Sequence, residues 1–249
     1  MAERAAIVTG ASSGIGLALA HMLGSEGHAL TVASRRPEKL EPAAQELRDA
    51  GYEVEAVPAN FGGADSEAEV QKVVAAHRDR FGRLDVLCNN AGVGIGAGVG
   101  EIVTKRMDIQ LNTNLRQIIL FYREALELLK AAGAEHRNAL VINTASISGK
   151  RAEAWLNIYS ATKYAVVGFT EAMNKELNGD GIKSTALCPA FVDTPMTDFV
   201  KGQVPAEKMI QTSDIAEMAR ALLKLTPGCV VPDIVFDLPG SGVLGSTPA

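Results

Sequence analysis

Cysteines, clustered histidines and long apolar runs are all scarce in this chain of 249 residues. The 3 cysteines, Cys88, Cys188 and Cys229, are widely spaced and form no Cys-x-x-Cys pair, which argues against a disulfide framework and favours a reducing, cytoplasmic setting. The 4 histidines form no ligand-spaced cluster with each other or with a cysteine, so we assign no metal. No uninterrupted apolar segment approaches the roughly 18 residues of a membrane-spanning helix, so we expect no membrane partner.

An excess of basic charge is also lacking. The chain has 24 Lys and Arg against 29 Asp and Glu, interleaved along the sequence, for a formal net charge of −5. This pattern offers no basic surface to nucleic acid or to an anionic membrane, so the expected partner is a small molecule. The length and the 47% hydrophobic content fit one large domain with a single core, and we predict one domain over residues 1–249.

Short apolar runs alternate with longer amphipathic segments along the whole chain. Strict alternation of this kind predicts an α/β fold: a doubly wound (Rossmann) parallel sheet of about seven strands, with helices on both faces and ligands beyond the carboxyl ends of the strands. The third helix opens with Ser66-x-x-Glu69, a capping-box pattern. The expected strands are 5–9, 29–34, 53–57, 86–89, 139–144, 183–188 and 233–236, and the expected helices are 15–25, 37–50, 66–81, 107–131, 159–178 and 213–226.

A glycine-rich turn follows the first expected strand directly. The segment Thr9-Gly-Ala-Ser-Ser-Gly-Ile-Gly16 leads into a helix. Glycines at such a turn let the backbone approach a pyrophosphate, and the helix N-terminus offers N–H groups and a positive dipole to it. A tight turn would explain one glycine but not three with small residues between them, so the turn predicts a dinucleotide site.

Tyr159 and Lys163 form the second motif, with Ser146 upstream of them at the end of the fifth expected strand. Residues four apart share a helix face, so the phenol and the ammonium can reach one small volume. A neighbouring cation favours the phenolate and lowers the pKa of a tyrosine from about 10 toward the working range. A Ser146 hydroxyl beside them could bond a substrate oxygen. The three groups suit carbonyl reduction or alcohol oxidation.

Together, Thr-Gly-x-x-x-Gly-Ile-Gly, Asn89-Asn-Ala-Gly92, Ser146 and Tyr159-x-x-x-Lys163 resemble the single-domain short-chain dehydrogenase/reductase family over nearly the whole chain. The resemblance implies a nicotinamide cofactor, a homo-oligomer (dimer or tetramer), and a Ser–Tyr–Lys group completed by an asparagine that helps to hold a proton-relay water. Asn114, followed by Leu115, matches that asparagine better than Asn112 does. An asparagine that bonds its own helix backbone is the alternative. The implied catalytic residues are Asn114, Ser146, Tyr159 and Lys163.

The end of the second expected strand indicates which cofactor is bound. Ser34 stands where NAD-preferring members of the family usually carry an aspartate, and Arg35 and Arg36 follow it. An acid there would bond the ribose 2′-hydroxyl, whereas arginines can accommodate a 2′-phosphate. We therefore expect NADP(H) in preference to NAD(H). Two solvated arginines before the next helix are the alternative.

Two positions depart from the family pattern. The usual aspartate after the third strand is replaced by Asn60, and the usual Pro-Gly after the sixth strand is Pro189-Ala190. The resemblance still assigns the nicotinamide carboxamide to the Val192 backbone and the Thr194 hydroxyl. The complete set of expected cofactor contacts is Gly10, Ser12, Ser13, Gly14, Ile15, Gly16, Ser34, Arg35, Arg36, Asn60, Phe61, Asn90, Ala91, Gly92, Tyr159, Lys163, Pro189, Ala190, Val192 and Thr194.

Residues 190–208 follow Pro189, contain Pro195 and Pro205, and show no clear strand, which predicts a flexible segment that covers the substrate. The glycine-rich run 92–100 is interpreted as a loop near the substrate and not as a second nucleotide site. The substrate stays open: a 3-oxoacyl thioester, a steroid-like ketone and a small hydroxy acid all fit the family. A cofactor-sensing protein without catalysis is the competing function, although the complete constellation argues against it.

Overall fold

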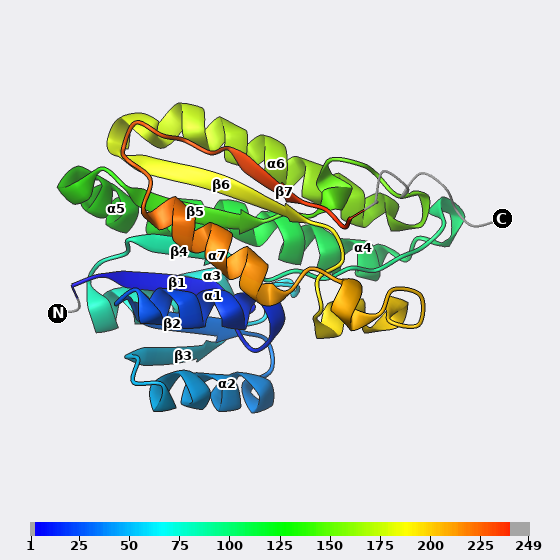
Figure 1. The fold of residues 1–249 in the computed structure, drawn as a ribbon, viewed down its shortest axis with the longest axis horizontal. Coiled ribbons are helices and arrows are strands. Elements are labelled where there is room, and N and C mark those ends of the chain that lie inside the picture. The colour runs from blue at the N-terminus through cyan, green and yellow to red at the C-terminus, as the bar shows by residue number, and fades with distance from the viewer. Residues whose placement is uncertain (1–2, 240–249) are drawn as a thin grey trace.

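A seven-stranded parallel sheet forms the centre of the protein in the computed structural model, which describes residues 3–239 (Figure 1). The strand order is β3-β2-β1-β4-β5-β6-β7, so the chain winds outward from β1 in one direction and from β4 in the other. This confirms the predicted doubly wound fold. The strands are β1 Ala5–Thr9, β2 Ala29–Ser34, β3 Val54–Pro58, β4 Val86–Asn89, β5 Ala139–Thr144, β6 Ile182–Pro189 and β7 Asp233–Phe236.

Helices cover both faces of the sheet because its central strands are buried on both sides. One buried cluster joins α1, α2 and α7 to one face, and a second joins α3, α5 and α6 to the other. Figure 1 shows α1 and α7 side by side across the strands. The α-helices are α1 Gly14–Ser25, α2 Pro37–Asp49, α3 Ser66–Phe81, α4 Thr104–Leu111, α5 Gln117–His136, α6 Asn157–Leu177 and α7 Thr212–Leu223.

No helix within residues 3–239 is long and apolar enough to cross a membrane.

The helix predicted over 107–131 lies within a continuous helical stretch over residues 104–136, but the π-helical turn inside it was not predicted. The chain forms α4, then the π-helical turn η2 (Asn112–Arg116), and only then α5. Such turns insert an extra residue into a helix and often occur at functional sites. Here the turn carries Asn114, whose buried side chain bonds the backbone of Val93 on another segment. The contact joins Asn114 to a residue 21 positions earlier in the chain. The spacing of apolar residues along the helix therefore does not reveal the π-helical turn.

The predicted capping box at the start of α3 is also wrong. The residue before the helix is Asp65, and the buried Ser66 hydroxyl has no hydrogen-bond partner. Glu69 instead accepts hydrogen bonds from the backbone N–H of Asn60 and from Lys72. The carboxylate therefore fixes the chain after β3 and does not cap the helix.

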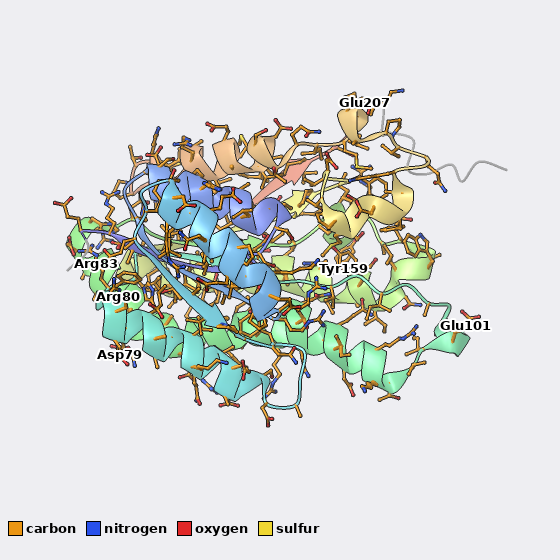
Figure 2. All side chains as sticks on the ribbon, turned by 90° about the horizontal axis from the view of Figure 1, so that it is seen from below. Asp79, Arg80, Arg83, Glu101, Tyr159 and Glu207 are labelled. Carbon is orange, nitrogen blue, oxygen red and sulfur yellow. The ribbon has the colours of Figure 1, made fainter. Side chains whose placement is uncertain are left out.

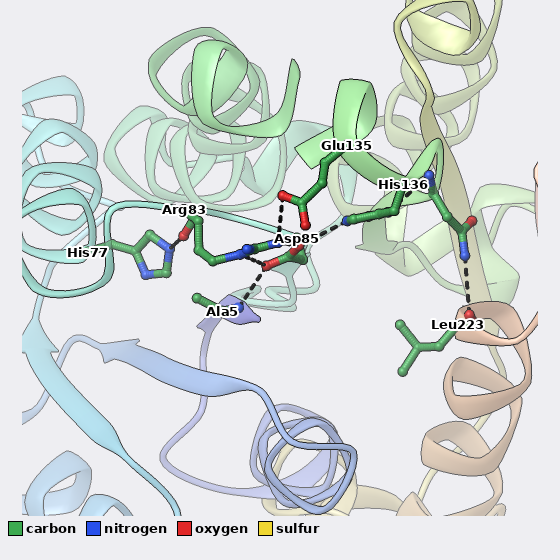
Figure 3. Close-up of polar contacts among 8 residues, drawn as sticks. Ala5, His77, Arg83, Asp85, Glu135, His136 and Leu223 are labelled. Atoms are coloured by element: carbon green, nitrogen blue, oxygen red, sulfur yellow. Dashed lines mark hydrogen bonds and ion pairs between the residues drawn. The ribbon is translucent and has the colours of Figure 1, made fainter. Parts of the chain in front are cut away.

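The amino-terminal edge of the sheet is held by Asp85, a buried carboxylate just before β4 (Figure 3). Asp85 accepts hydrogen bonds from the Ala5 N–H at 2.8 Å, from two nitrogens of Arg83 at 2.9 and 2.7 Å, and from His136 Nε2 at 2.9 Å. Burial by itself raises the pKa of Asp85, but these bonds outweigh it and hold the pKa below its ordinary value. One side chain thus connects β1, β4 and the end of α5.

The segment 190–208, predicted to be a flexible cover, contains the short 3₁₀ helices η6 (Pro195–Val200) and η7 (Ala206–Lys208). Val192 forms an isolated parallel bridge with Ile210. Thr194 caps η6 through reciprocal hydrogen bonds with Thr197. Movement of the segment remains a prediction.

Candidate active site

Tyr159 and Lys163 lie in the first turns of α6, on one face of the helix as predicted. Figure 2 shows Tyr159 well away from Arg83, which belongs to the amino-terminal edge of the sheet. The Lys163 ammonium lies 5.5 Å from the centre of the Tyr159 ring and donates a hydrogen bond to the carbonyl oxygen of Thr144 at 2.7 Å. Burial lowers the pKa of Lys163 to about 8.

Ser146 reaches the same volume from the end of β5. It caps the 3₁₀ turn η3 (Ile147–Gly149), where its hydroxyl accepts a hydrogen bond from the Ser148 N–H at 3.1 Å. Burial raises the pKa of Tyr159, and a hydrogen bond with Ser146 opposes that shift in part. The predicted lowering of the Tyr159 pKa by Lys163 is wrong for this structure, because Lys163 does not contribute to the shift and its ammonium is bonded to Thr144.

Asn114 is buried beside this group and has all its side-chain bonds within the protein. Its Oδ1 accepts from the Val93 N–H at 2.8 Å, and its Nδ2 donates to the Val93 carbonyl at 2.9 Å and to Thr162 Oγ1 at 3.1 Å. A Cβ placed on Gly92 would lie 3.5 Å from both Asn114 Oδ1 and Lys163 Nζ. The side chain therefore connects the loop after β4 to α6, next to the lysine.

The turn between β1 and α1 leaves no room for side chains at its glycine positions. Gly10 and Gly14 have positive φ angles of 68° and 56°, a region that favours glycine. A Cβ on Gly16 would lie 2.3 Å from the Gly10 carbonyl oxygen, and one on Gly14 would lie 3.0 Å from the Thr194 methyl group. Ser12, Ser13 and Ile15 complete the turn and the start of α1, whose N-terminus is open to an anion. The turn fits a pyrophosphate.

Asn90 and Thr9 brace this turn. The Asn90 amide donates to the carbonyl of Thr9 at 3.1 Å and accepts from the Thr144 hydroxyl at 3.0 Å, and the Thr9 hydroxyl accepts from the N–H groups of Asn90 and Ala91. The Asn90 side chain thus links β1, β4 and β5 at the site, and contact of Asn90 with the cofactor stays a prediction.

The end of β2 fits a phosphorylated adenosine ribose. The Ser34 hydroxyl is buried and has no hydrogen-bond partner. Arg35 and Arg36 are exposed, and neither forms an ion pair within the described residues. An orphaned hydroxyl beside two unpaired guanidinium groups, with no carboxylate between 34 and 36, suits a 2′-phosphate better than a bare 2′-hydroxyl.

The remaining expected cofactor contacts, at the ends of β3 and β6, differ in exposure. Asn60 is exposed at the end of β3, whereas the Phe61 ring lies in the core, edge-to-face with Phe121 at 5.4 Å between ring centres. Phe61 could therefore meet a cofactor only through its backbone. Pro189 is buried at the end of β6. Ala190 does not have a positive φ, so alanine in place of the family's glycine adds no backbone strain there.

Three residues that sequence reasoning did not single out also shape the site. Thr144 supplies the carbonyl that holds Lys163, and the Thr162 hydroxyl bonds Asn114. A Cβ on Gly149 would lie 2.7 Å from the Lys163 carbonyl oxygen, so η3 packs directly on α6. Thr144 could have been noticed at the end of an expected strand. Thr162 and Gly149 contact residues that are distant in sequence, so no sequence pattern indicates their role.

The chain matches the short chain dehydrogenase family model over residues 4–204 and belongs to that family. It is therefore an oxidoreductase that acts on the CH–OH/C=O pair with a nicotinamide cofactor.

Proteins named as ketoacyl or polyketide ketoreductases are among those it resembles. A Streptomyces coelicolor protein named as a candidate ketoacyl reductase is 36% identical over 88% of this chain and 89% of its own length. The structure of a variant of the actinorhodin polyketide ketoreductase with NADPH has a TM-score of 0.83 at 33% identity, covering 95% of this chain and 97% of that one. The 3-ketoacyl-(acyl-carrier-protein) reductase of Brucella melitensis, complexed with NADH, has a TM-score of 0.84 at 28% identity, covering 97% of this chain and 99% of that one.

Proposed function

We propose that this protein reduces a carbonyl compound to an alcohol, with Tyr159 as the proton donor and NADP(H) as the preferred cofactor. The observation that carries the proposal is the half-buried Tyr159 phenol beside Ser146 and Lys163. Because burial raises the pKa of Tyr159, the phenol keeps its proton near neutral pH. A protonated donor at the site is what the reduction direction requires.

Each side chain then has a separate task. Ser146 donates a hydrogen bond to the substrate carbonyl oxygen and orients it against the Tyr159 hydroxyl, which delivers the proton to that oxygen. The Lys163 ammonium has donors left after its bond to Thr144, and these would hold the cofactor ribose. Asn114 fixes the loop after β4 and supports proton supply. A reduced nicotinamide, when bound, supplies the hydride.

The preference for NADP(H) follows from the end of β2. Arg35 and Arg36 have no carboxylate partner within the described residues, and Ser34 offers a buried hydroxyl where an acid would repel a phosphate. The NADPH of the actinorhodin enzyme supports this choice, whereas the NADH of the Brucella enzyme shows that relatives use both cofactors. The preference for NADP(H) over NAD(H) therefore rests on the positive charge of Arg35 and Arg36.

We also propose a homo-oligomer. Several apolar residues of α5 and α6, such as Ile118, Phe121 and Val166, are buried within the subunit. Ile119 on α5 and Tyr164 on α6 remain exposed and offer apolar surface to a second copy. Light scattering after size-exclusion chromatography tests this, and a purely monomeric protein would contradict it.

The function is tested with the Tyr159→Phe variant and a panel of ketones. Loss of the phenolic proton donor is expected to lower kcat by at least about 10²-fold while NADPH binding is retained. The readouts are NADPH oxidation at 340 nm and NADPH affinity by fluorescence titration. A variant that keeps its activity would exclude Tyr159 as the proton donor, and a native protein that oxidises no NADPH with any ketone would argue against the function itself.

A further inference from the structure

Trp155 and Phe199 form an exposed aromatic pair at the mouth of the site. Their ring centres are 5.9 Å apart and the rings meet edge-to-face at 78°. Trp155 belongs to the 3₁₀ turn η4 (Ala154–Leu156) just before α6, and Phe199 to η6, more than 40 residues later. Trp155 is 47% exposed and Phe199 is 63% exposed. Two segments distant in sequence thus place large apolar rings together in solvent.

The Trp155 side of this pair is rigidly tied to the catalytic residues. Trp155 lies four residues before Tyr159, and its carbonyl accepts a hydrogen bond from the Ala97 N–H at 2.9 Å. A Cβ on Gly96 would lie 2.5 Å from the indole ring, so the ring packs directly on the glycine-rich loop. A Cβ on Gly94, in the same loop, would lie 3.8 Å from the Tyr159 ring. One wall therefore runs from the Tyr159 ring to the indole.

The Phe199 side is tied to the cofactor turn. The helix η6 begins at Thr194, whose methyl group lies against Gly14. Met196, also on η6, is 50% exposed and adds a flexible apolar side chain. The helix η6 thus begins against the cofactor turn and places Phe199 against Trp155. A contiguous exposed apolar patch of this kind marks a binding surface.

We propose that Trp155 and Phe199 determine substrate specificity by holding a broad, flat apolar group attached to the carbonyl carbon. This inference rests on the proposed ketone reduction and deepens it. The preferred substrate class is ketones with fused or aromatic rings, which stack on the indole while the carbonyl reaches Tyr159 and Ser146. Small aliphatic ketones reach the same catalytic groups but leave the aromatic pair uncovered.

The chain contains a single tryptophan, so its fluorescence reports on this site alone. The inactive Tyr159→Phe variant, loaded with NADP⁺, is titrated with 1-tetralone and with cyclohexanone. We expect saturable quenching or a blue shift of Trp155 emission with the bicyclic ketone and none with the monocyclic one. Equal responses to both ketones, or no saturable response to either, would overturn the proposal.

Kinetics on matched variants supply the second test. In Trp155→Ala and Phe199→Ala, kcat/KM for 1-tetralone is expected to fall about tenfold, mainly through KM, with less than a threefold change for cyclohexanone. Trp155→Phe keeps a ring and is expected to fall in between. Met218→Ala, an exposed apolar residue on α7, serves as the control and changes neither value.

Different results would contradict the proposed function and the role of the aromatic pair. If the native protein reduces no ketone of the panel with either cofactor, the proposed function fails; if it reduces other ketones but not 1-tetralone, only the assignment of the aromatic pair fails. If it reduces both 1-tetralone and cyclohexanone, and Trp155→Ala and Trp155→Phe lower the two kcat/KM values by the same factor, only the assignment of the aromatic pair fails.

Discussion

The Nζ atom of Lys163 donates a hydrogen bond to the carbonyl oxygen of Thr144 at 2.7 Å, which ties the catalytic helix α6 to the end of β5. The bond places a buried cation between two segments that carry the other proposed catalytic groups: β5 leads to Ser146, and α6 carries Tyr159. Lys163 therefore helps to set the geometry of the site as well as its charge.

The pH dependence of ketone reduction follows from the two pKa shifts at the site. Reduction needs Tyr159 as a phenol and Lys163 as an ammonium, and both forms prevail below pH 8, because the pKa of Lys163 is about 8 and that of Tyr159 is raised. We expect kcat/KM to be level near pH 7 and to fall about tenfold per pH unit well above pH 8. Lys183→Met, at the opposite edge of the sheet, should leave the profile unchanged; a level profile up to pH 10 would argue against a required Lys163 ammonium.

Removing the positive charge after β2 should alter cofactor preference. In the double variant Arg35→Ala/Arg36→Ala, we expect the KM for NADPH to rise about 10- to 100-fold, since each lost charge-assisted hydrogen bond contributes about 1.5–3 kcal/mol. The KM for NADH should change little. Arg78→Ala, an exposed arginine on α3, is the control. Equal losses with both cofactors would mean that the arginines do not recognise the 2′-phosphate.

A methyl group at Gly149 should separate Ser146 from the catalytic helix. The new Cβ would lie 2.7 Å from the Lys163 carbonyl oxygen, so η3 has to move away from α6. Displacement of a catalytic group by about 1 Å can lower the rate about 10²-fold, and we expect Gly149→Ala to lower kcat on that order. Gly168→Ala is the matched control on α6, because its Cβ would meet nothing within 4 Å. Unchanged kcat in Gly149→Ala would show that the contact does not position Ser146.

Asp85 should contribute to stability and not to catalysis. Asp85→Asn leaves Arg83 and His136 without their carboxylate and is expected to lower the free energy of unfolding by about 2–4 kcal/mol, near the range for breaking a buried ion pair. The pKa of Asp85 is lowered by folding, so its contribution is present above about pH 4, the unfolded value, and is lost as pH falls through the folded pKa.

Urea unfolding of Asp85→Asn and the native protein at pH 7 and pH 3 measures this contribution. The difference between the two should be smaller at pH 3 than at pH 7. Glu41→Gln, which removes an exposed ion pair with Arg48, should leave stability unchanged. A difference that does not shrink in acid would point to a packing effect and not to the charge of Asp85.

The sequence alone determined the alternation of strands and helices, and with it the sheet and the edge at which ligands bind. Local patterns suffice there, because a buried parallel strand needs a continuous apolar run and a phosphate turn needs glycines at fixed places. Five of the seven expected strands have the bounds seen in the structure, and the other two differ by one residue at each end. The positions of Ser146, Tyr159 and Lys163 relative to these elements followed from the same patterns.

Only the tertiary structure decided how those residues are held and tuned. In the π-helical turn before α5, Asn114 bonds Val93; the Asn90 side chain bonds β1 and β5, and Phe61 packs into the core. The raised pKa of Tyr159 arises from its removal from solvent in the folded chain. Each is a contact across space between parts of the chain far apart in sequence, and neither hydrophobic period nor motif spacing records such contacts.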